Sequence, residues 1–278
     1  MNKITYFEAQ KRASLCIKAQ NLPVDAAKYL MMERLNWDDV HLLMHYREIM
    51  PENELKQFQT DINRFINGEP AQYIIGKANF YGNDLIVNSN VLIPRPETEE
   101  LVDWILNDNA DGPLNVLDVG TGSGAIAIAL KQQRPQWNVW ASDISSAALE
   151  VAEKNAIKNH VDINFKHSDL FTNINSKFDI IVSNPPYISG DETPYMDESV
   201  VKYEPHTALF AKNNGLELYQ RISLERGDVS KQNSTLYLEI GFKQQDAVVD
   251  IFKQQNPLSK IEAKQDLANH PRMVKIQD

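Results

Sequence analysis

The segment that most constrains the fold joins an apolar run, a glycine-rich turn and a second apolar run without a break. Residues 115–119 read Asn-Val-Leu-Asp-Val, residues 120–124 read Gly-Thr-Gly-Ser-Gly, and residues 125–133 continue as an apolar stretch of helical length. Glycines at such a junction allow a tight turn and let the backbone approach a ligand closely. The segment therefore predicts a strand, a ligand-binding loop and a helix in direct succession.

The chain that follows repeats this alternation of strand and helix. Nearly continuous apolar runs, such as Ile180-Ile181-Val182, are typical of strands buried on both faces of a parallel sheet. We therefore predict an α/β fold with a doubly wound, mostly parallel sheet. The expected strands are 115–119, 139–143, 163–167, 178–183 and 236–240, with two more between 258 and 277, and the expected helices are 125–133, 147–159 and 216–226.

The N-terminal part of the chain has a helical pattern instead. From residue 71 to residue 96 the pattern becomes strand-like, and two apolar stretches flank Gly82-Asn83-Asp84, which is a hairpin signal. We therefore predict a helical bundle at residues 1–72, a hairpin connector at 73–96 and the α/β domain at 97–278. Within the bundle the expected helices are 6–19, 26–35, one from residue 40, and one from 51 to 66, with Asp25 as an N-cap and Asp38-Asp39 as the capped start before residue 40.

Composition limits the classes of partner and compartment. The net charge of −10 at pH 7 disfavours a nucleic-acid binder, because such proteins carry basic patches that neutralise phosphates. The single cysteine fits a reducing compartment, and the sequence has neither a signal-peptide pattern nor an apolar run of roughly 18 residues. His41 and His45 lack the intervening glutamate of a zinc-binding helix, so no metal site is expected. These features predict a cytoplasmic protein that has a protein partner and contacts neither nucleic acid nor a membrane.

The glycine loop is the first indication of a ligand. The helix that follows it presents free N–H groups at its N-terminus, which favour an anion such as the carboxylate of a methionine group. Asp143 ends the next expected strand, 143 − 124 = 19 residues after the last glycine, where a carboxylate can accept hydrogen bonds from ribose hydroxyls. This pattern alone fits either NAD or S-adenosyl-methionine. The spacing G-x-G-x-G, rather than G-x-G-x-x-G, favours S-adenosyl-methionine.

A second loop, Asn184-Pro185-Pro186-Tyr187, directly follows the buried strand at 178–183. If the first and fourth strands lie where strand order reverses, this loop and the glycine loop face one crevice. An amide or aryl-amine nitrogen is a poor nucleophile because its lone pair is delocalised. The Asn184 oxygen and a carbonyl of the Pro-Pro turn can accept hydrogen bonds from its N–H groups, and Tyr187 can stack on a planar group. The loop therefore predicts methyl transfer to a planar amide or amine nitrogen.

Further segments carry a resemblance to a known family: Gln72-Tyr73-Ile74-Ile75-Gly76, Phe80-Tyr81-Gly82, Val-Leu-Ile-Pro-Arg-Pro-Glu-Thr-Glu at 91–99, the glycine loop and NPPYI at 184–188. In this order, from about residue 64 to the C-terminus, they resemble the peptide chain release factor glutamine methyltransferases, the HemK/PrmC family. The resemblance implies a class I S-adenosyl-methionine methyltransferase fold, which is Rossmann-like with a seven-stranded, mostly parallel sheet. It also implies an N-terminal helical domain that helps to hold the release factor.

The activity implied by the resemblance is methylation of the N5 amide nitrogen of the glutamine in the Gly-Gly-Gln motif of class 1 peptide chain release factors. S-adenosyl-methionine is the donor and S-adenosyl-homocysteine the product, and we expect a monomer. Asn184, Pro185 and Tyr187 are expected to be catalytic, and the whole run from Asn184 through Pro186 to Tyr187 is expected to bind the target glutamine. The expected cofactor-binding residues are Asp118, Gly120, Thr121, Gly122, Ser123, Gly124, Asp143, Asp169, Leu170 and Asn184, with Asp169-Leu170 beside the adenine.

The chain departs from the family pattern at two positions outside the reacting loop. Family members often have Asp where this chain has Asn214, and glycine where it has Asn269. Both departures affect only the expected local geometry of loops. Two other features are interpreted as structural: Glu239 as strand-end packing, and the acidic segment 191–204 as a mobile, solvated stretch that can order over the substrate.

Three alternatives stay open. An adenine-N6 methyltransferase of DNA or RNA uses the same Asn-Pro-Pro-Tyr chemistry, although it has to extrude a base and bind phosphates. A sister glutamine methyltransferase would modify a ribosomal protein. A non-catalytic module would bind the cofactor without turning it over.

Overall fold

The structure is a computed structural model that describes residues 4–109 and 112–277 and contains two compact units. The first unit is Met1–Gly76 with Asp197–Tyr203, and the second is Lys77–Met196 with Glu204–Asp278. Of the predicted domain ranges, residues 1–3, 110–111 and 278 lie outside the described residues. The hairpin predicted as a connector belongs, from Lys77 onward, to the second unit.

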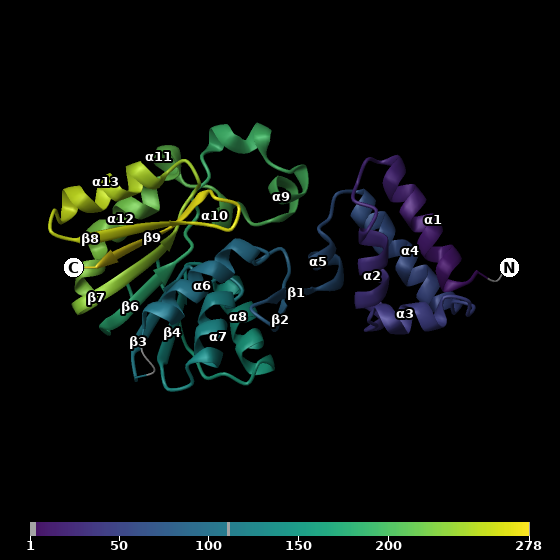
Figure 1. Ribbon diagram of the computed structural model, residues 1–278, viewed down its shortest axis with the longest axis horizontal. Coiled ribbons are helices and arrows are strands. Elements are labelled where there is room, and N and C mark those ends of the chain that lie inside the picture. The colour runs from purple at the N-terminus through teal and green to yellow at the C-terminus, as the bar shows by residue number, and fades with distance from the viewer. Residues whose placement is uncertain (1–3, 110–111, 278) are drawn as a thin grey trace. The chain divides into compact units, whose positions relative to one another are not determined.

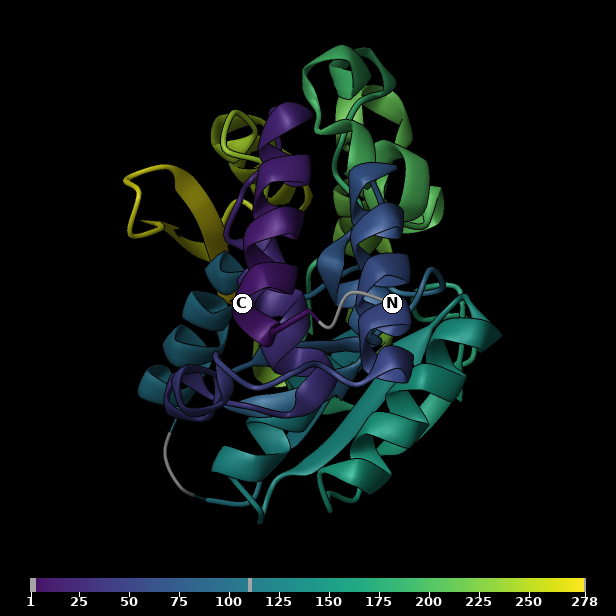
Figure 2. The ribbon, with the colours of Figure 1, turned by 90° about the vertical axis from the view of Figure 1, so that its right-hand side faces the viewer.

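The helical unit is built around α1 (Tyr6–Ala19), α2 (Ala26–Leu35) and α4 (Glu52–Ile66), which pack against one another (Figures 1 and 2). Their buried faces, with Ile17, Leu30 and Phe58, form one apolar core. Three shorter helices complete the unit, namely α3 (Asp39–His45), α5 (Ala71–Ile75) and α9 (Glu198–Tyr203). α9 is joined to the rest by the Tyr203 hydroxyl, which donates to the Asn67 carbonyl at 3.1 Å.

Two local predictions in this unit are wrong. Residues 71–75 form α5 rather than the start of a strand-like region, because Pro70 leads into a helical turn that Gly76 ends at a φ of 79°. The Asp25 side chain makes no capping hydrogen bond. Of the predicted pair Asp38-Asp39, Asp38 caps α3 by accepting from the His41 N–H at 2.8 Å.

The second unit contains the predicted seven-stranded sheet, in the order β5-β4-β3-β6-β7-β9-β8. All neighbouring strands are parallel except for β9, which is antiparallel to both β7 and β8. The chain goes outward from β3 through β4 to β5 and then crosses back to β6, so strand order reverses between β3 and β6. The strands are β3 (Asn115–Val119), β4 (Asn138–Asp143), β5 (Asn164–His167), β6 (Phe178–Ser183), β7 (Ser230–Glu239), β8 (Lys260–Gln265) and β9 (Pro271–Gln277).

Helices cover both faces of the sheet, with α6, α7 and α8 on one side and α12 and α13 on the other (Figure 1). Because side chains alternate along a strand, Val116 packs on the first side and Leu117 on the second. The covering helices are α6 (Pro96–Asp108), α7 (Ala125–Gln133), α8 (Ser146–Lys158), α12 (Glu217–Glu225) and α13 (Gln245–Gln255). No helix in the described part of the chain is long and apolar enough to cross a membrane.

The boundaries of β3, α7 and β6 are as predicted, while other elements differ. β7 begins at Ser230 rather than at residue 236, and α13 was not predicted. The segment after β6 is helical: η1 (Gly190–Tyr195) and α9 are followed by α10 (His206–Leu209) and α11 (Lys212–Gly215), with η2 (Arg226–Asp228) after α12. The prediction that 191–204 is solvated throughout is wrong, because Glu204 is buried and its carboxylate accepts from the Ile93 N–H and from Arg95.

A short hairpin, β1 (Lys77–Phe80) and β2 (Asn83–Ile86), is held to the sheet unit by Asn155 of α8. Its turn is Tyr81-Gly82, both at positive φ, and not the predicted Gly82-Asn83-Asp84. The buried Asn155 amide accepts from the Ile86 N–H at 2.6 Å and donates to the carbonyls of Ile86 and Ser123, each at 2.9 Å. One side chain therefore joins the hairpin, helix α8 and the glycine loop.

Asn155→Ala tests this junction. The substitution leaves buried backbone groups of Ile86 and Ser123 without their partner, so we expect the free energy of unfolding to fall by about 3 kcal/mol. Urea unfolding followed by circular dichroism measures the change. Asn159→Ala, at the C-cap of the same helix and half-buried, is the matched control. It removes a single 3.3 Å hydrogen bond to the hairpin, at the Asp84 carbonyl, and should have a clearly smaller effect. Equal losses in the two variants would contradict the assigned role.

Candidate functional site

A cavity of about 540 Å³ opens at the carboxyl ends of the central strands, within the sheet unit. Four strand ends contribute to it: Gly120–Ser123 after β3, Asp143 as the last residue of β4, Asp169-Leu170 after β5, and Asn184 after β6. This is the edge of the sheet at which ligands bind in doubly wound folds. The glycine loop and the Asn-Pro-Pro-Tyr loop thus face one cavity, as the sequence predicts.

Backbone hydrogen bonds hold the glycine loop open toward the cavity. The N–H groups of Gly120 and Thr121 both donate to the Ser142 carbonyl, at 2.8 and 2.9 Å. Gly122 lines the cavity and has a φ of 55°, and a Cβ atom there would meet no other atom within 4 Å. Among the described N–H groups at the start of α7, those of Ser123, Ala125 and Ile126 donate to no protein acceptor. They remain available for an anion at the helix N-terminus.

Asp118 and Gly124 lie beneath this loop and do not line the cavity. The Asp118 carboxylate accepts from the Thr121 hydroxyl at 2.6 Å and from the Ala127 N–H at 3.3 Å, so it supports the loop and the first turn of α7. Burial raises the pKa of Asp118 to about 7. Gly124 has a φ of 83°, and a Cβ atom there would lie 3.2 Å from that of Ala152, so it lets α7 approach α8.

Two carboxylates on the cavity wall are already held by protein groups. Asp143 accepts from the N–H groups of Gly122, at 2.9 Å, and of Ser145, at 2.8 Å, while burial raises its pKa. Asp169 pairs with Arg221 at 2.9 Å, a partner that sequence reasoning missed. Each carboxylate oxygen has a second lone pair, so both groups can still accept from a ligand.

Leu170 follows Asp169 in a left-handed conformation with a φ of 46°, which is uncommon for a leucine. The Ser168 hydroxyl stabilises this turn by donating to the Leu170 carbonyl at 2.9 Å and accepting from the Asn173 N–H at 3.0 Å. Leu170 lines the cavity as a result. Its apolar side chain suits a flat, uncharged ring such as adenine.

The backbone of the reacting loop is fixed at Tyr187. The Gln244 amide donates to the Tyr187 carbonyl at 2.9 Å and accepts from the Gly241 N–H at 3.1 Å. Gly215 lies against the same carbonyl, and it has a φ of 80°. A Cβ atom at Gly215 would stand 1.9 Å from the Tyr187 carbonyl oxygen, so only glycine fits here.

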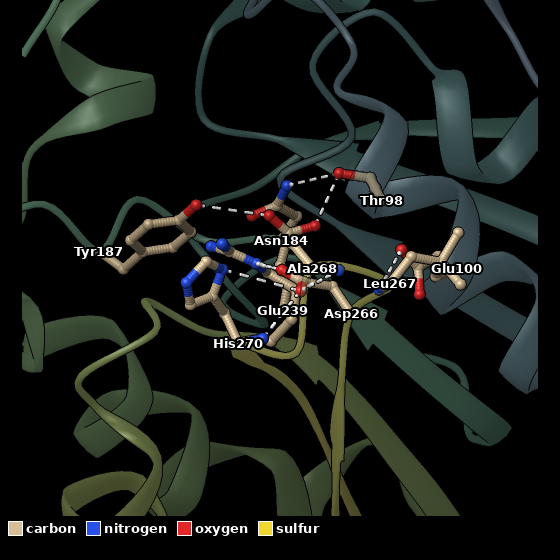
Figure 3. A network of polar contacts seen from close by, with 10 residues as sticks. Thr98, Glu100, Asn184, Tyr187, Glu239, Asp266, Leu267, Ala268 and His270 are labelled. Carbon is tan, nitrogen blue, oxygen red and sulfur yellow. Dashed lines mark hydrogen bonds and ion pairs between the residues drawn. The ribbon is translucent and has the colours of Figure 1, made fainter.

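The side chains of the loop meet a buried carboxylate, shown in Figure 3. The Asn184 amide N–H donates to the Thr98 hydroxyl at 3.3 Å, and that hydroxyl lies 2.6 Å from Glu239 Oε2. The Tyr187 hydroxyl lies 3.4 Å from Glu239 Oε1. Asn184 and Pro186 line the cavity, whereas Pro185 and Tyr187 do not.

Sequence reasoning missed two members of this network. Thr98 lies within the segment 91–99 that carries the family resemblance, but no role was assigned to it. Glu239 is only 2% exposed, and its interpretation as strand-end packing is incomplete because it contacts Thr98 and Tyr187. A carboxylate at the carboxyl end of a buried strand was the available signal.

Gly215→Ala tests the backbone geometry of the reacting loop. The added methyl group has to displace the Tyr187 carbonyl, so we expect kcat to fall about tenfold or more through misplacement of the loop, with the affinity for the methyl donor little changed. Methyl-transfer kinetics and calorimetric titration of the donor measure the two quantities. Gly227→Ala, where a Cβ atom meets open space, is the matched control. Unchanged kcat in Gly215→Ala would show that the loop can shift without loss.

Asp118→Asn tests the buried charge under the glycine loop. The folded-state pKa of about 7 is above the ordinary 3.8, so the contribution of Asp118 to stability is present below pH 3.8 and is lost as pH rises through 7. The difference corresponds to at most about 4 kcal/mol. We expect the free energy of unfolding to fall less between pH 5 and pH 8 in Asp118→Asn than in the wild type. Urea titrations at both pH values measure the free energy of unfolding. An equal decrease between pH 5 and pH 8 in the two proteins would argue against a buried charge.

The family model "Methyltransferase small domain" matches residues 98–203, and "PrmC N-terminal domain" matches residues 8–76. A methyltransferase structure from Pyrococcus furiosus aligns with a TM-score of 0.54 at 16% identity, over 82% of this chain and 98% of that one. This likeness concerns the fold alone, which is that of class I S-adenosyl-methionine-dependent methyltransferases, as predicted.

Two curated relatives match most of the chain. The release factor glutamine methyltransferase of Enterococcus faecalis is 45% identical over 270 residues, which covers 97% of this chain and 98% of the relative. That of Streptococcus pneumoniae is 46% identical over 251 residues, which covers 90% of this chain and 89% of the relative. The family resemblance predicted from the sequence is thereby confirmed. The chain belongs to the family of release factor glutamine methyltransferases.

Proposed function

We propose that this protein transfers a methyl group from S-adenosyl-methionine to the N5 amide nitrogen of the glutamine in the Gly-Gly-Gln motif of class 1 peptide chain release factors. The observation that carries the proposal is that Asn184 lines the same cavity as Gly120–Ser123. A hydrogen-bond acceptor for an amide therefore faces the loop suited to the donor. Membership in the family of release factor glutamine methyltransferases indicates that this amide is a glutamine side chain of a release factor.

The residues of the cavity fit S-adenosyl-methionine. The unpartnered N–H groups at the start of α7 suit the carboxylate of its methionine part, Asp143 its ribose hydroxyls, and Asp169 and Leu170 its adenine. When bound, the donor supplies a methyl group on a positively charged sulfur. Asp118 and Gly124 act indirectly, since they shape the loop from below.

The protein's own contribution to the chemistry is positioning. The Asn184 side-chain oxygen and a carbonyl of the Pro-Pro turn accept hydrogen bonds from the two N–H groups of the target amide. Both acceptors hold the nitrogen so that its lone pair points at the methyl group, which stabilises the charge that develops in the transition state. Pro185 and Pro186 stiffen the turn. The ring of Tyr187, which does not line the cavity in this structure, is proposed to pack against the planar amide once the release factor is bound. The nitrogen loses its proton to solvent after transfer.

The helical unit is proposed to help hold the release factor, and the sheet unit to carry the reaction. We infer a cytoplasmic location, because the single cysteine and the release-factor substrate fit that compartment. We also propose that the protein acts as a monomer. The net charge of −10 argues against direct contact with nucleic acid.

The test is a methyl-transfer assay with purified release factors and S-adenosyl-methionine, followed by mass spectrometry of the peptide that contains Gly-Gly-Gln. We expect one added methyl group on the glutamine, and none when that glutamine is replaced by alanine. In Asn184→Ala we expect kcat to fall by about 100-fold, the scale of losing one transition-state hydrogen bond. The Kd of the donor should stay within about threefold, since the glycine loop is untouched.

Parallel reactions with DNA, RNA and ribosomal proteins serve as comparisons. Methyl groups in nucleic acid or in a ribosomal protein, with none in release factors, would overturn the proposal. Full activity of Asn184→Ala would leave the fold as a binding module and contradict the assigned chemistry.

A further inference from the structure

Glu239 has no part in the chemistry described above, yet it is the buried carboxylate closest to the reacting loop. It is the last residue of β7 and is 2% exposed. A buried charge is unfavourable unless it is hydrogen-bonded. Both of its carboxylate oxygens contact this loop or a residue that contacts it (Figure 3).

The Thr98 hydroxyl has one proton and is placed between two partners. Glu239 Oε2 lies 2.6 Å from it and Asn184 Nδ2 lies 3.3 Å from it. An ionised carboxylate only accepts hydrogen bonds, so the Thr98 proton goes to Glu239. The lone pairs of the hydroxyl then face Asn184, and only the amide NH₂ group can donate to them.

This direction has a consequence for Asn184. The two ends of an asparagine amide have nearly the same shape, and their hydrogen-bond partners decide which end points where. Because the NH₂ end is taken by Thr98, the oxygen is the end left for the substrate. Within the described residues, no protein donor is recorded on that oxygen.

The other carboxylate oxygen of Glu239 faces Tyr187. The Tyr187 hydroxyl donates to Oε1 at 3.4 Å, and the Tyr219 hydroxyl donates to the backbone carbonyl of Glu239 at 3.0 Å. The carboxylate itself is thereby fixed in place. One side chain on β7 thus holds both Asn184, through Thr98, and Tyr187.

We propose that Glu239 is a positioning residue which, through Thr98, orients the Asn184 amide so that its oxygen, and not its NH₂ group, faces the nitrogen to be methylated. The inference rests on the proposed function, because it concerns how that reaction is prepared. Glu239 touches neither donor nor substrate. The hydrogen-bond chain Asn184–Thr98–Glu239 carries its effect.

Protonation of Glu239 can reverse the direction of the hydrogen bonds that link it through Thr98 to Asn184. When the proton is on Oε2, the neutral carboxyl group donates to Thr98, the Thr98 hydroxyl then donates to Asn184, and the amide turns its oxygen inward. The NH₂ group would then face the substrate amide and repel its N–H groups. The active orientation is therefore favoured by the ionised form of Glu239, in which Oε2 can only accept.

Several groups around Glu239 set its pKa, and so the pH at which it becomes protonated. Burial raises the pKa of Glu239 to about 7, and the Glu97 carboxylate of α6 acts in the same direction. The Thr98 hydrogen bond, the Arg272 guanidinium of β9 and the Tyr187 hydroxyl lower it. The Arg272 guanidinium also forms an ion pair with Asp266, with its Nε 3.1 Å from Asp266 Oδ2. The Tyr219 hydroxyl of α12 donates to the backbone carbonyl of Glu239. Activity should therefore rise with pH through the neutral range.

The experiment compares four variants with the wild type. Glu239→Gln removes the titration, Thr98→Val removes the hydroxyl, and Thr98→Ser restores it on a smaller side chain. Thr235→Val, in the middle of the same strand β7, is the matched control for loss of a buried threonine hydroxyl. Each is checked for folding by circular dichroism and thermal unfolding, and then for kcat, KM for release factor and Kd of the donor.

We expect Thr98→Val to lower kcat by about 10- to 100-fold, as for a misplaced reacting group, with the Kd of the donor unchanged. Thr98→Ser should recover most of that loss, and Thr235→Val should behave as the wild type. The wild type should show an acidic limb in kcat with an apparent pKa near 7, which Glu239→Gln lacks. Unaltered kcat in Thr98→Val, or an identical acidic limb in Glu239→Gln, would overturn the proposal.

A second readout is independent of turnover. With ¹⁵N-labelled asparagine, the side-chain NH₂ signals of Asn184 are identified by their loss in Asn184→Asp. We expect these signals to shift with pH in the wild type and not in Glu239→Gln. If the wild type methylates no release factor, the proposed function fails while this titration still tests the orientation. If methylation occurs but the signals do not titrate, the positioning role alone is refuted.

Discussion

The parallel pairing of β3 with β6 is the constraint on which the site depends. Val119 lies opposite Ser183, and the Ser183 hydroxyl donates to the Val119 carbonyl at 2.7 Å. The next residues along the two strands are Gly120 and Asn184. The donor loop and the acceptor loop therefore start side by side, although 64 residues separate the two strand ends along the chain. The chemistry follows from this contact, because each loop alone is only a turn after a strand.

Features set by local sequence could be predicted from it. The bounds of β3, α7 and β6 agree with prediction, because apolar periodicity and glycine placement act over a few residues. The common cavity of both loops was also predicted, from the rule that ligands bind where strand order reverses. The family followed from motifs such as residues 91–99, which the relatives of this chain bear out.

Features set by distant partners could not be predicted. Thr98 and Glu239 are 141 residues apart, and nothing near either residue in the sequence indicates the other. The same holds for Glu204, whose acidic neighbours suggested solvent but whose carboxylate is buried against Arg95. Helix α5 was missed because Ala71–Ile75 has an apolar composition that also suits a strand.

Asn155 has a consequence beyond stability. Its single amide bonds the backbone of β2 and the backbone of the glycine loop, so the order of one segment is coupled to that of the other. A ligand that rigidifies the loop also rigidifies the hairpin, and by thermodynamic reciprocity a contact that rigidifies the hairpin strengthens binding at the loop. The hairpin is thereby linked to the cavity, whose wall also includes Phe80 of β1.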